Sequence, residues 1–194
     1  IQEARDLSTR AFEAWKMWAK ASQEEVDRVC AAMATAAFNA AERLGQMAQE
    51  ETGFGIPAHK RMKNEFAARN VWESIREIKT TGVIRYDAAK KIYDIAWSMG
   101  VVAALTPSTN PTSTVIYKIL IAVKARDAII IAPHPSAVKC SYEATELMAK
   151  AAVENGAPPG LVSCMRHVSL AGTQELMSHK YVAVILATGG TPMV

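Results

Sequence analysis

Polar, turn-forming clusters follow three apolar segments of this chain, and their side chains are of types that bind or polarise ligands. The first cluster is Thr106-Pro107-Ser108-Thr109-Asn110-Pro111, in which four hydroxyl or amide side chains stand among prolines. A donor here could stabilise an oxygen that becomes negative during a reaction. The alternative interpretation is a helix cap, which needs only one of these side chains. Thr109 or Asn110 would then be the N-cap, with Pro111 at the first helical position.

The second and third clusters are Pro133-His134-Pro135 and Thr188-Gly189-Gly190. A histidine between two prolines has little freedom; it could contact a ribose or a phosphate, or bond only to nearby backbone. The glycines would leave backbone amides exposed where a helix begins, which suits phosphate, although a tight turn explains them equally. No other histidine or cysteine has ligand spacing with His134, so we expect no metal site.

Cys30, Cys140 and Cys164 are candidate nucleophiles by residue type alone. Cys30 falls on the apolar face of a predicted helix and Cys164 inside a predicted strand, whereas Cys140 stands in the first turns of a helix, where a thiolate is favoured. None follows a glycine-rich nucleophile turn, so we expect all three to be structural. Scattered cysteines in odd number argue against a disulfide framework and for a reducing, cytoplasmic compartment.

Composition narrows the function classes. The chain has 194 residues, half of them hydrophobic and 21% charged, which predicts one globular domain. Its net charge of +3 is too small to indicate a nucleic-acid partner. The longest apolar runs have the length of strands, so we expect no membrane span. The chain begins without Met, inside a predicted helix, and we expect it to be one part of a longer protein.

Apolar runs alternate with helical stretches from residue 98 onward, which predicts a parallel α/β sheet. In open sheets of this kind, ligands bind at the carboxyl ends of the strands, where the three polar clusters stand. The dinucleotide fingerprint GxGxxG is absent. The predicted strands cover residues 100–105, 128–132, 161–165 and 182–187, and the predicted helices between them cover 112–125, 136–155 and 171–179.

Helical periodicity precedes this core. It predicts helices over residues 1–20, from a capping box at Ser22 and Glu25 to about residue 50, and over 66–79, with Gly53 as a helix stop. β-branched and aromatic residues on both sides of Asp87 predict a hairpin over 81–97, either an ordinary surface ribbon or an arm that pairs with another subunit. We therefore expect N-terminal helices over 1–80, an arm over 81–97 and a βαβ core over 98–194.

Three stretches of this chain resemble the CoA-acylating branch of the aldehyde dehydrogenase superfamily. They are GVVAALTPSTNPTSTVIYKILIAVKARDAIIIAPHPSA, AAVENGAPPGLV and VAVILATGGTPMV. The T-P-x-T-N-P and P-H-P elements are the specific part. Non-acylating members have an aromatic-Asn pair in the first turn and Lys-Pro-Ser in the second, where this chain has Ala132, Pro133 and His134. The branch includes one half of the bifunctional alcohol/aldehyde dehydrogenases and the microcompartment propionaldehyde and acetaldehyde dehydrogenases.

The resemblance implies a three-layer α/β sandwich and a hairpin arm that joins subunits into a dimer or tetramer. For microcompartment members it also implies association with the shell. It implies that a cysteine thiolate attacks a short-chain aldehyde, that hydride passes to NAD or NADP, and that coenzyme A then releases the product as an acyl-CoA. The nucleophilic cysteine and most of the aldehyde pocket would lie beyond Val194.

The resemblance also implies roles for individual residues. Thr109 or Asn110 would supply the oxyanion donor. The residues expected to bind the cofactor are Thr106, Pro107 and Ser108 beside the nicotinamide, Pro133, His134 and Pro135 at the adenosine end, and Thr188, Gly189 and Gly190 near the pyrophosphate. Three alternatives remain: a non-catalytic nucleotide-binding or assembly module, a non-acylating aldehyde dehydrogenase, and an enzyme of the same fold that reduces an acyl phosphate.

Overall fold

The computed structural model of the chain describes residues 1–188. Within these residues, four parallel strands form one sheet in the order β5-β4-β3-β6. Every residue of the two central strands is buried, as expected for continuous apolar runs in a parallel sheet covered on both faces. The predicted parallel sheet is therefore confirmed. Its strands are β3 (Val101–Leu105), β4 (Ala128–Ala132), β5 (Val162–Cys164) and β6 (Val182–Leu186).

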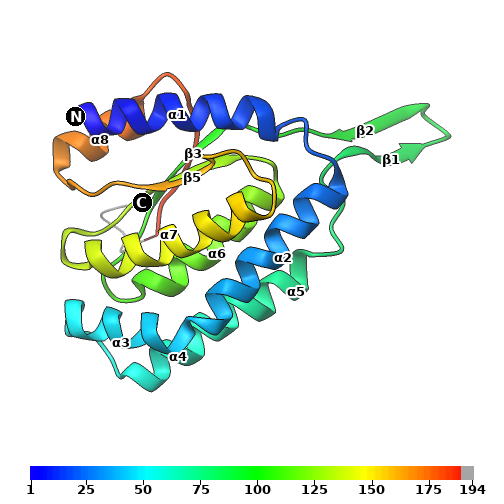
Figure 1. Ribbon diagram of the computed structural model, residues 1–194. Coiled ribbons are helices and arrows are strands. Elements are labelled where there is room, and N and C mark those ends of the chain that lie inside the picture. Colours follow the sequence, from blue (N-terminus) through cyan, green and yellow to red (C-terminus); the bar gives the residue numbers. More distant parts are fainter. Residues whose placement is uncertain (189–194) are drawn as a thin grey trace.

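Helices cover both faces of the sheet (Figure 1). On one face lie α1 (Gln2–Trp18) and α8 (Leu170–Ser178), and on the other lie α6 (Pro111–Lys124) and α7 (Val138–Glu154), which follows the short 3₁₀ turn η2 (Pro135–Ala137). This confirms the predicted three-layer arrangement. A further helical layer packs outside α6 and α7, formed by α2 (Gln23–Asn39), α3 (Ala41–Thr52), α4 (Pro57–Glu65) and α5 (Val71–Ile75).

The helix predicted from the capping box to about residue 50 is two helices. The capping box itself is confirmed, because Ser22 and Glu25 each accept a hydrogen bond from the other's backbone amide. The chain then bends at Ala40, and Gly53 ends α3 in the left-handed region with a φ of 70°. The bend lets α3 pack closely on α4, where a Cβ at Gly45 would lie 2.8 Å from the Arg61 backbone nitrogen.

The helix predicted over 66–79 begins earlier and ends earlier. It starts at Pro57 as α4, passes through a π-helical turn, η1 (Phe66–Asn70), and ends at Ile75. Ile78 falls within the predicted range, but it follows the helix end and is exposed. The π-turn inserts one extra residue per turn, which changes the face that the helix presents to α6. None of the helices within residues 1–188 has the length and hydropathy that crossing a membrane requires.

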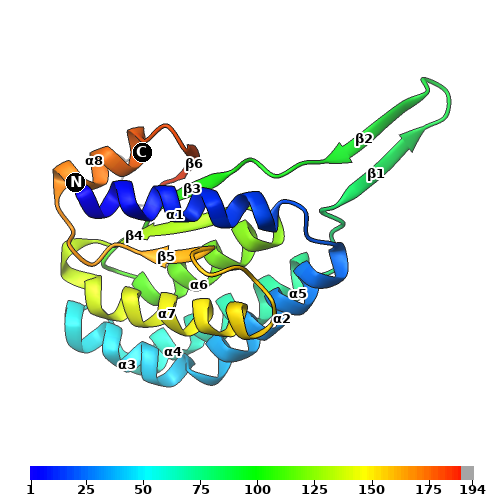
Figure 2. The ribbon, with the colours of Figure 1, turned by 45° about the horizontal axis from the view of Figure 1, so that its top comes forward.

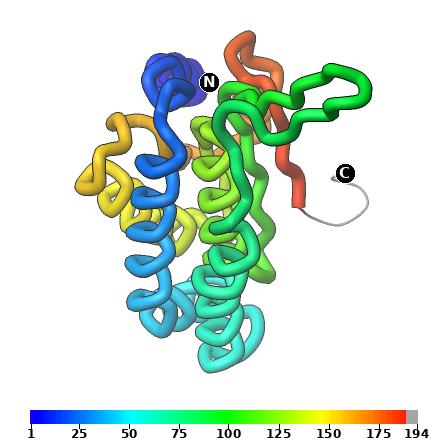
Figure 3. The backbone as a smooth tube through the Cα atoms, turned by 90° about the vertical axis from the view of Figure 1, so that its right-hand side faces the viewer, coloured from blue at the N-terminus to red at the C-terminus, as the bar shows by residue number. Residues whose placement is uncertain are grey.

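The predicted hairpin is formed by β1 (Gly82–Asp87) and β2 (Ile92–Ala96), which pair antiparallel. It projects away from the sheet and helices, as two further views show (Figures 2 and 3). Arg126 fixes its base, because the guanidinium donates to the carbonyl oxygens of Ala19 (2.7 Å), Thr80 (3.1 Å) and Ala96 (3.0 Å). Its exposed large apolar side chains are Val83, Ile84, Tyr86, Ile92, Tyr93 and Ile95.

Candidate functional site

A cleft of about 230 Å³ opens at the carboxyl ends of β3 and β4. We call it the strand-end cleft. Thr106 follows β3, Pro133, His134 and Pro135 follow β4, and all four residues line it. The opposite wall is formed by the loop before α8 and its first turns, within residues 168–173. Thr106 of the first polar cluster and all three residues of the second therefore share one cleft, because the ends of neighbouring parallel strands meet at one edge of the sheet.

Two polar groups at the strand-end cleft differ in how they are satisfied. The Thr106 amide donates to the carbonyl of Ala132 at 3.1 Å, and its buried hydroxyl has no hydrogen-bond partner within the described residues. Such a group costs roughly 1–3 kcal/mol unless it finds a partner. Nδ1 of His134 accepts from the Ser136 amide at 3.1 Å, so the backbone contact considered from the sequence does form. In the neutral ring, Nε2 then carries the proton and can donate to a ligand.

One face of α4 holds the turn that follows β3. Nζ of Lys60 donates to the Thr109 carbonyl at 3.0 Å, and Nζ of Lys63 donates to Oδ1 of Asn110 at 2.8 Å. Asn64 accepts from the Thr112 hydroxyl at 2.8 Å. The three side chains of α4 share a face because they are spaced by three and four residues. The turn is therefore fixed by tertiary contacts as well as by its own prolines.

The Asn110 side chain does not cap α6, although Asn110 is the N-cap residue and Pro111 follows it. Its Oδ1 accepts from Lys63, and within residues 1–188 its Nδ2 makes only a long contact of 3.5 Å with Oγ1 of Thr109. An ammonium group can only donate, so Lys63 determines which end of the amide is bound. The amide nitrogen of Asn110 is left available to donate to a ligand oxygen.

The turn predicted as one site lines two different hollows. Thr106 lines the strand-end cleft, whereas Thr109 and Asn110 line a hollow of about 500 Å³ beside α4. Pro107 and Ser108 connect the two. Of the third cluster, Thr188 lies with its hydroxyl 3.2 Å from the Tyr117 hydroxyl. Gly189 and Gly190 lie outside the described residues.

An apolar hollow of about 390 Å³ adjoins the same turn. Met62, Phe66 and Tyr117 are among its lining residues, and Met62 also lines the hollow that contains Asn110. Met62 is 64% exposed and Phe66 is 61% exposed, so two large apolar side chains face solvent beside a polar turn. This surface suits a short hydrocarbon chain. Sequence reasoning missed this surface, because neither α4 nor the π-turn was predicted.

Lys118 is a further residue that the sequence reasoning missed. Its side chain is fully buried, and Nζ donates to the carbonyl oxygens of Leu105 (2.7 Å) and Leu186 (2.6 Å). These residues end β3 and β6, so one ammonium group joins two strands that lead into candidate turns. Burial lowers the pKa of Lys118 to about 8. The available signal was a single lysine in an otherwise apolar stretch, VIYKILIAV.

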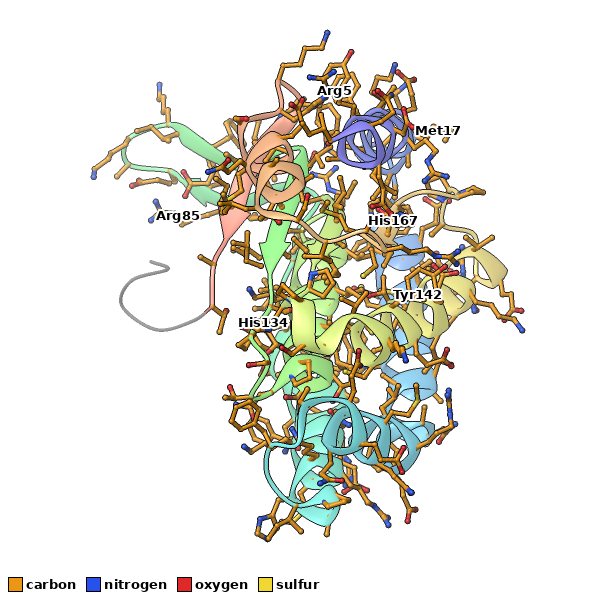
Figure 4. The ribbon with its side chains drawn as sticks, turned by 90° about the vertical axis from the view of Figure 1, so that its left-hand side faces the viewer. Arg5, Met17, Arg85, His134, Tyr142 and His167 are labelled. Atoms are coloured by element: carbon orange, nitrogen blue, oxygen red, sulfur yellow. The ribbon has the colours of Figure 1, made fainter. Side chains whose placement is uncertain are left out.

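Helix α1 supports the outer wall of the strand-end cleft. The Glu3 carboxylate accepts from the backbone amides of Arg166 (2.7 Å) and His167 (2.9 Å), directly before the residues that line the cleft. Arg5 pairs with Glu175 of α8 through two hydrogen bonds of 2.9 and 3.1 Å. Figure 4 shows Arg5 beside α8.

The three cysteines are free and buried, as the sequence predicted. Desolvation raises the pKa of each thiol to about 12. Near Cys140, the carboxylate of Glu51 accepts from the amides of Lys139 (2.8 Å) and Cys140 (2.7 Å), and it is a second cause of the raised pKa of this thiol. No cysteine of this chain is therefore suited to act as a nucleophile. Within residues 1–188, no group of three His, Cys, Asp or Glu side chains is placed to hold a metal ion.

Comparison with known proteins agrees with this arrangement. The acetylating aldehyde dehydrogenase of Geobacillus thermoglucosidasius is 51% identical, with a TM-score of 0.97 over 98% of this chain and 42% of that protein. The bifunctional aldehyde-alcohol dehydrogenase of Escherichia coli is 38% identical over all 194 residues, which are 22% of its length. A propionaldehyde dehydrogenase of Rhodopseudomonas palustris, solved with bound propionyl-CoA, is 27% identical, with a TM-score of 0.84 over 97% of this chain and 42% of that protein.

The chain thus spans less than half of the length of these relatives. The acetylating enzyme and the enzyme solved with propionyl-CoA agree with the acylating branch that the T-P-x-T-N-P and P-H-P elements indicated. The family model described as the aldehyde dehydrogenase family matches residues 1–194. The chain therefore belongs to the aldehyde dehydrogenase family.

Proposed function

We propose that the full protein oxidises a short-chain aldehyde to its acyl-CoA, with NAD or NADP as the hydride acceptor. The observation that carries this proposal is the Asn110 amide, which Lys63 holds with its nitrogen available at the carboxyl end of β3. Membership of the family supports aldehyde oxidation, and the similarity to an acetylating enzyme supports coenzyme A as the acyl acceptor.

The strand-end cleft fits the adenosine end of a nicotinamide dinucleotide. Pro133, Pro135 and Leu170 provide apolar walls for a flat base, while Nε2 of His134 suits a ribose or phosphate oxygen. The nicotinamide, when bound, supplies the hydride acceptor. The roles of Pro107, Ser108, Thr188, Gly189 and Gly190 in holding the cofactor remain part of this proposal.

The catalytic task that we assign to this chain is stabilisation of the aldehyde oxygen. Asn110 donates a hydrogen bond to that oxygen as it gains negative charge when a thiolate adds to the carbonyl carbon. Met62 and Phe66 accommodate the hydrocarbon part of the substrate in the adjoining apolar hollow. The attacking thiolate comes from the part of the relatives' length that this chain does not span, because Cys30, Cys140 and Cys164 are buried.

We also propose that the hairpin joins subunits into a dimer or tetramer. Its large apolar side chains are exposed on a two-stranded ribbon, which is marginally stable by itself. The open edges of β1 and β2 can pair with a sheet of another copy. Light scattering on the full protein tests this, since a monomer would contradict it. Association with a microcompartment shell and a cytoplasmic location stay predictions.

The decisive experiment follows reduction of the cofactor by the full protein, with aldehyde and with or without coenzyme A. Acyl-CoA that appears in proportion to the reduced cofactor supports the proposal. Free acid formed at the same rate without coenzyme A would instead indicate a non-acylating enzyme, and dependence on inorganic phosphate would indicate acyl phosphate chemistry. Nucleotide binding without turnover would leave only a binding or assembly module.

A further inference from the structure

The hollow that contains Asn110 is basic. Besides Thr109 and Asn110 it is lined by Gly55, Ile56, His59, Lys60, Met62 and Lys63. Every ionisable side chain among these residues is a base, and no carboxylate of residues 1–188 lines the hollow. We call it the basic hollow. Its volume of about 500 Å³ exceeds that of the strand-end cleft, so it has room for a ligand group beside the turn.

The positive charge in the basic hollow has no acidic partner within the described residues. Lys60 is only 5% exposed, yet its Nζ donates to a neutral carbonyl, and Lys63 donates to a neutral amide. The carboxylates of Glu42 and Glu65, on α3 and α4, both pair with Arg61. Burial lowers the pKa of Lys60, and the neighbouring Lys63 charge acts in the same direction. An anion bound in the hollow would favour the charged form of Lys60 and so oppose both of these effects on its pKa.

The start of α4 adds to this field. Gly55 and Ile56 line the basic hollow directly before Pro57, the first residue of α4, and no side chain caps the first-turn amides. The amino end of a helix carries partial positive charge and favours negative groups. The charges of Lys60 and Lys63 and the partial charge of the helix end therefore all make the potential in the basic hollow positive.

The position of the basic hollow indicates which molecule would carry an anionic group bound there. The hollow shares Asn110 with the turn that would bind the reacting oxygen, and it shares Met62 and Lys63 with the apolar hollow. A charge bound here lies only a short carbon chain away from the aldehyde carbon. The phosphates of coenzyme A are separated from its thiol by the long pantetheine arm, so they suit this position less well than an acid group on the aldehyde itself.

We propose that the basic hollow binds a carboxylate or sulfonate at the far end of the aldehyde substrate. This rests on the proposed function and narrows its substrate class to short aldehydes with a terminal acid group. Lys63 can hold Asn110 and the anion together, because an ammonium group has three donors. His59 and Lys60 complete the positive surround.

The test compares 4-oxobutanoate with its neutral methyl ester, using the full protein and CoA-dependent reduction of the cofactor. We expect the wild type to prefer the acid, measured as the ratio of the two kcat/KM values. Lys63→Gln removes the charge but can still donate to Oδ1 of Asn110, so the ratio should fall roughly tenfold, as for one lost charge-assisted hydrogen bond. His59→Glu, which adds a negative charge without touching Asn110, should lower it as well.

Lys150→Gln is the matched control, because Lys150 lies on α7 with a side chain that is 76% exposed, and the ratio should not change. An unchanged ratio in both hollow variants would overturn the inference. A several-fold higher KM for coenzyme A in both variants, with the ratio unchanged, would assign the hollow to a phosphate of coenzyme A and also overturn it. If neither is oxidised but propanal is, the inference is overturned and the proposed function stands; if propanal is not oxidised either, the proposed function fails. Succinate binding by calorimetry, retained in wild type and weakened by Lys63→Gln, then tests the hollow alone.

Discussion

Nζ of Lys118 lies 2.6 Å from the carbonyl oxygen of Leu186, the last residue of β6. The same ammonium group also binds Leu105, the last residue of β3. It therefore sets the relative position of two strand ends, and with them the positions of Thr106 and Thr188. Lys118 is a positioning residue in this arrangement, because it lies in the core behind both segments.

Replacement of Lys118 by Met should destabilise the protein by about 2 kcal/mol or more, because two buried carbonyl groups lose their donor. The effect should depend on pH. Burial lowers the pKa of Lys118 from 10.5 to about 8, so between these values the unfolded chain binds more protons than the folded one. The stability of the wild type should therefore rise with pH in this window relative to Lys118→Met. Urea unfolding of both proteins at pH 7, 8, 9 and 10 measures the difference, and a constant gap would contradict the assignment.

Replacement of Asn110 by Ala should lower kcat of the full protein by roughly 10²–10³, the range seen when one oxyanion donor is removed. Thr109→Val is the matched comparison. It removes only a hydroxyl that contacts Nδ2 of Asn110 at 3.5 Å, while the backbone carbonyl that Lys60 binds stays in place. We expect it to change kcat by less than about fivefold. Equal losses in the two variants would show that the Asn110 amide is not the donor.

Glu3→Gln should raise KM for the nicotinamide cofactor several-fold and leave kcat within about twofold. The carboxylate holds the amides of Arg166 and His167, and its charged hydrogen bonds are about twice as strong as neutral ones. Glu13→Gln is the control, because Glu13 lies on the same helix, is exposed and pairs only with Lys16. Steady-state kinetics with varied cofactor separates the two parameters. A fall in kcat with unchanged KM would mean that Glu3 does not act through the strand-end cleft.

Arg126→Met should loosen the base of the hairpin and reduce subunit association. The substitution leaves the carbonyls of Ala19, Thr80 and Ala96 without their donor, at a cost of about 3 kcal/mol. Arg126 has a φ of 65°, and Met would keep that strain, so the change isolates the guanidinium. Arg76→Met, at an exposed surface pair with Glu77, should have little effect. Light scattering and urea unfolding measure both variants, and an unchanged oligomer in Arg126→Met would contradict this role.

The sequence by itself determined the α/β core and the turns at which we propose that ligands bind. Short continuous apolar runs bounded by turn residues are typical of strands buried on both faces of a covered parallel sheet. On this basis β4 was predicted with its observed limits, Ala128–Ala132. Proline and hydroxyl residues after the strands marked the turns, because their backbone preferences are local. The capping box at Ser22 and the hairpin over residues 81–97 followed from local patterns of the same kind.

Only the tertiary structure decided how those turns are used. The sequence placed Thr106 and Asn110 in one site, but the structure puts them in different hollows, because α4 rises beside Asn110 and the wall formed by residues 168–173 lies beside Thr106. The orientation of the Asn110 amide depends on Lys63, 47 residues earlier in the chain. The break at Ala40 and the π-turn arise from helix packing that no local periodicity records. Such features depend on distances between segments far apart in sequence, which only the folded chain fixes.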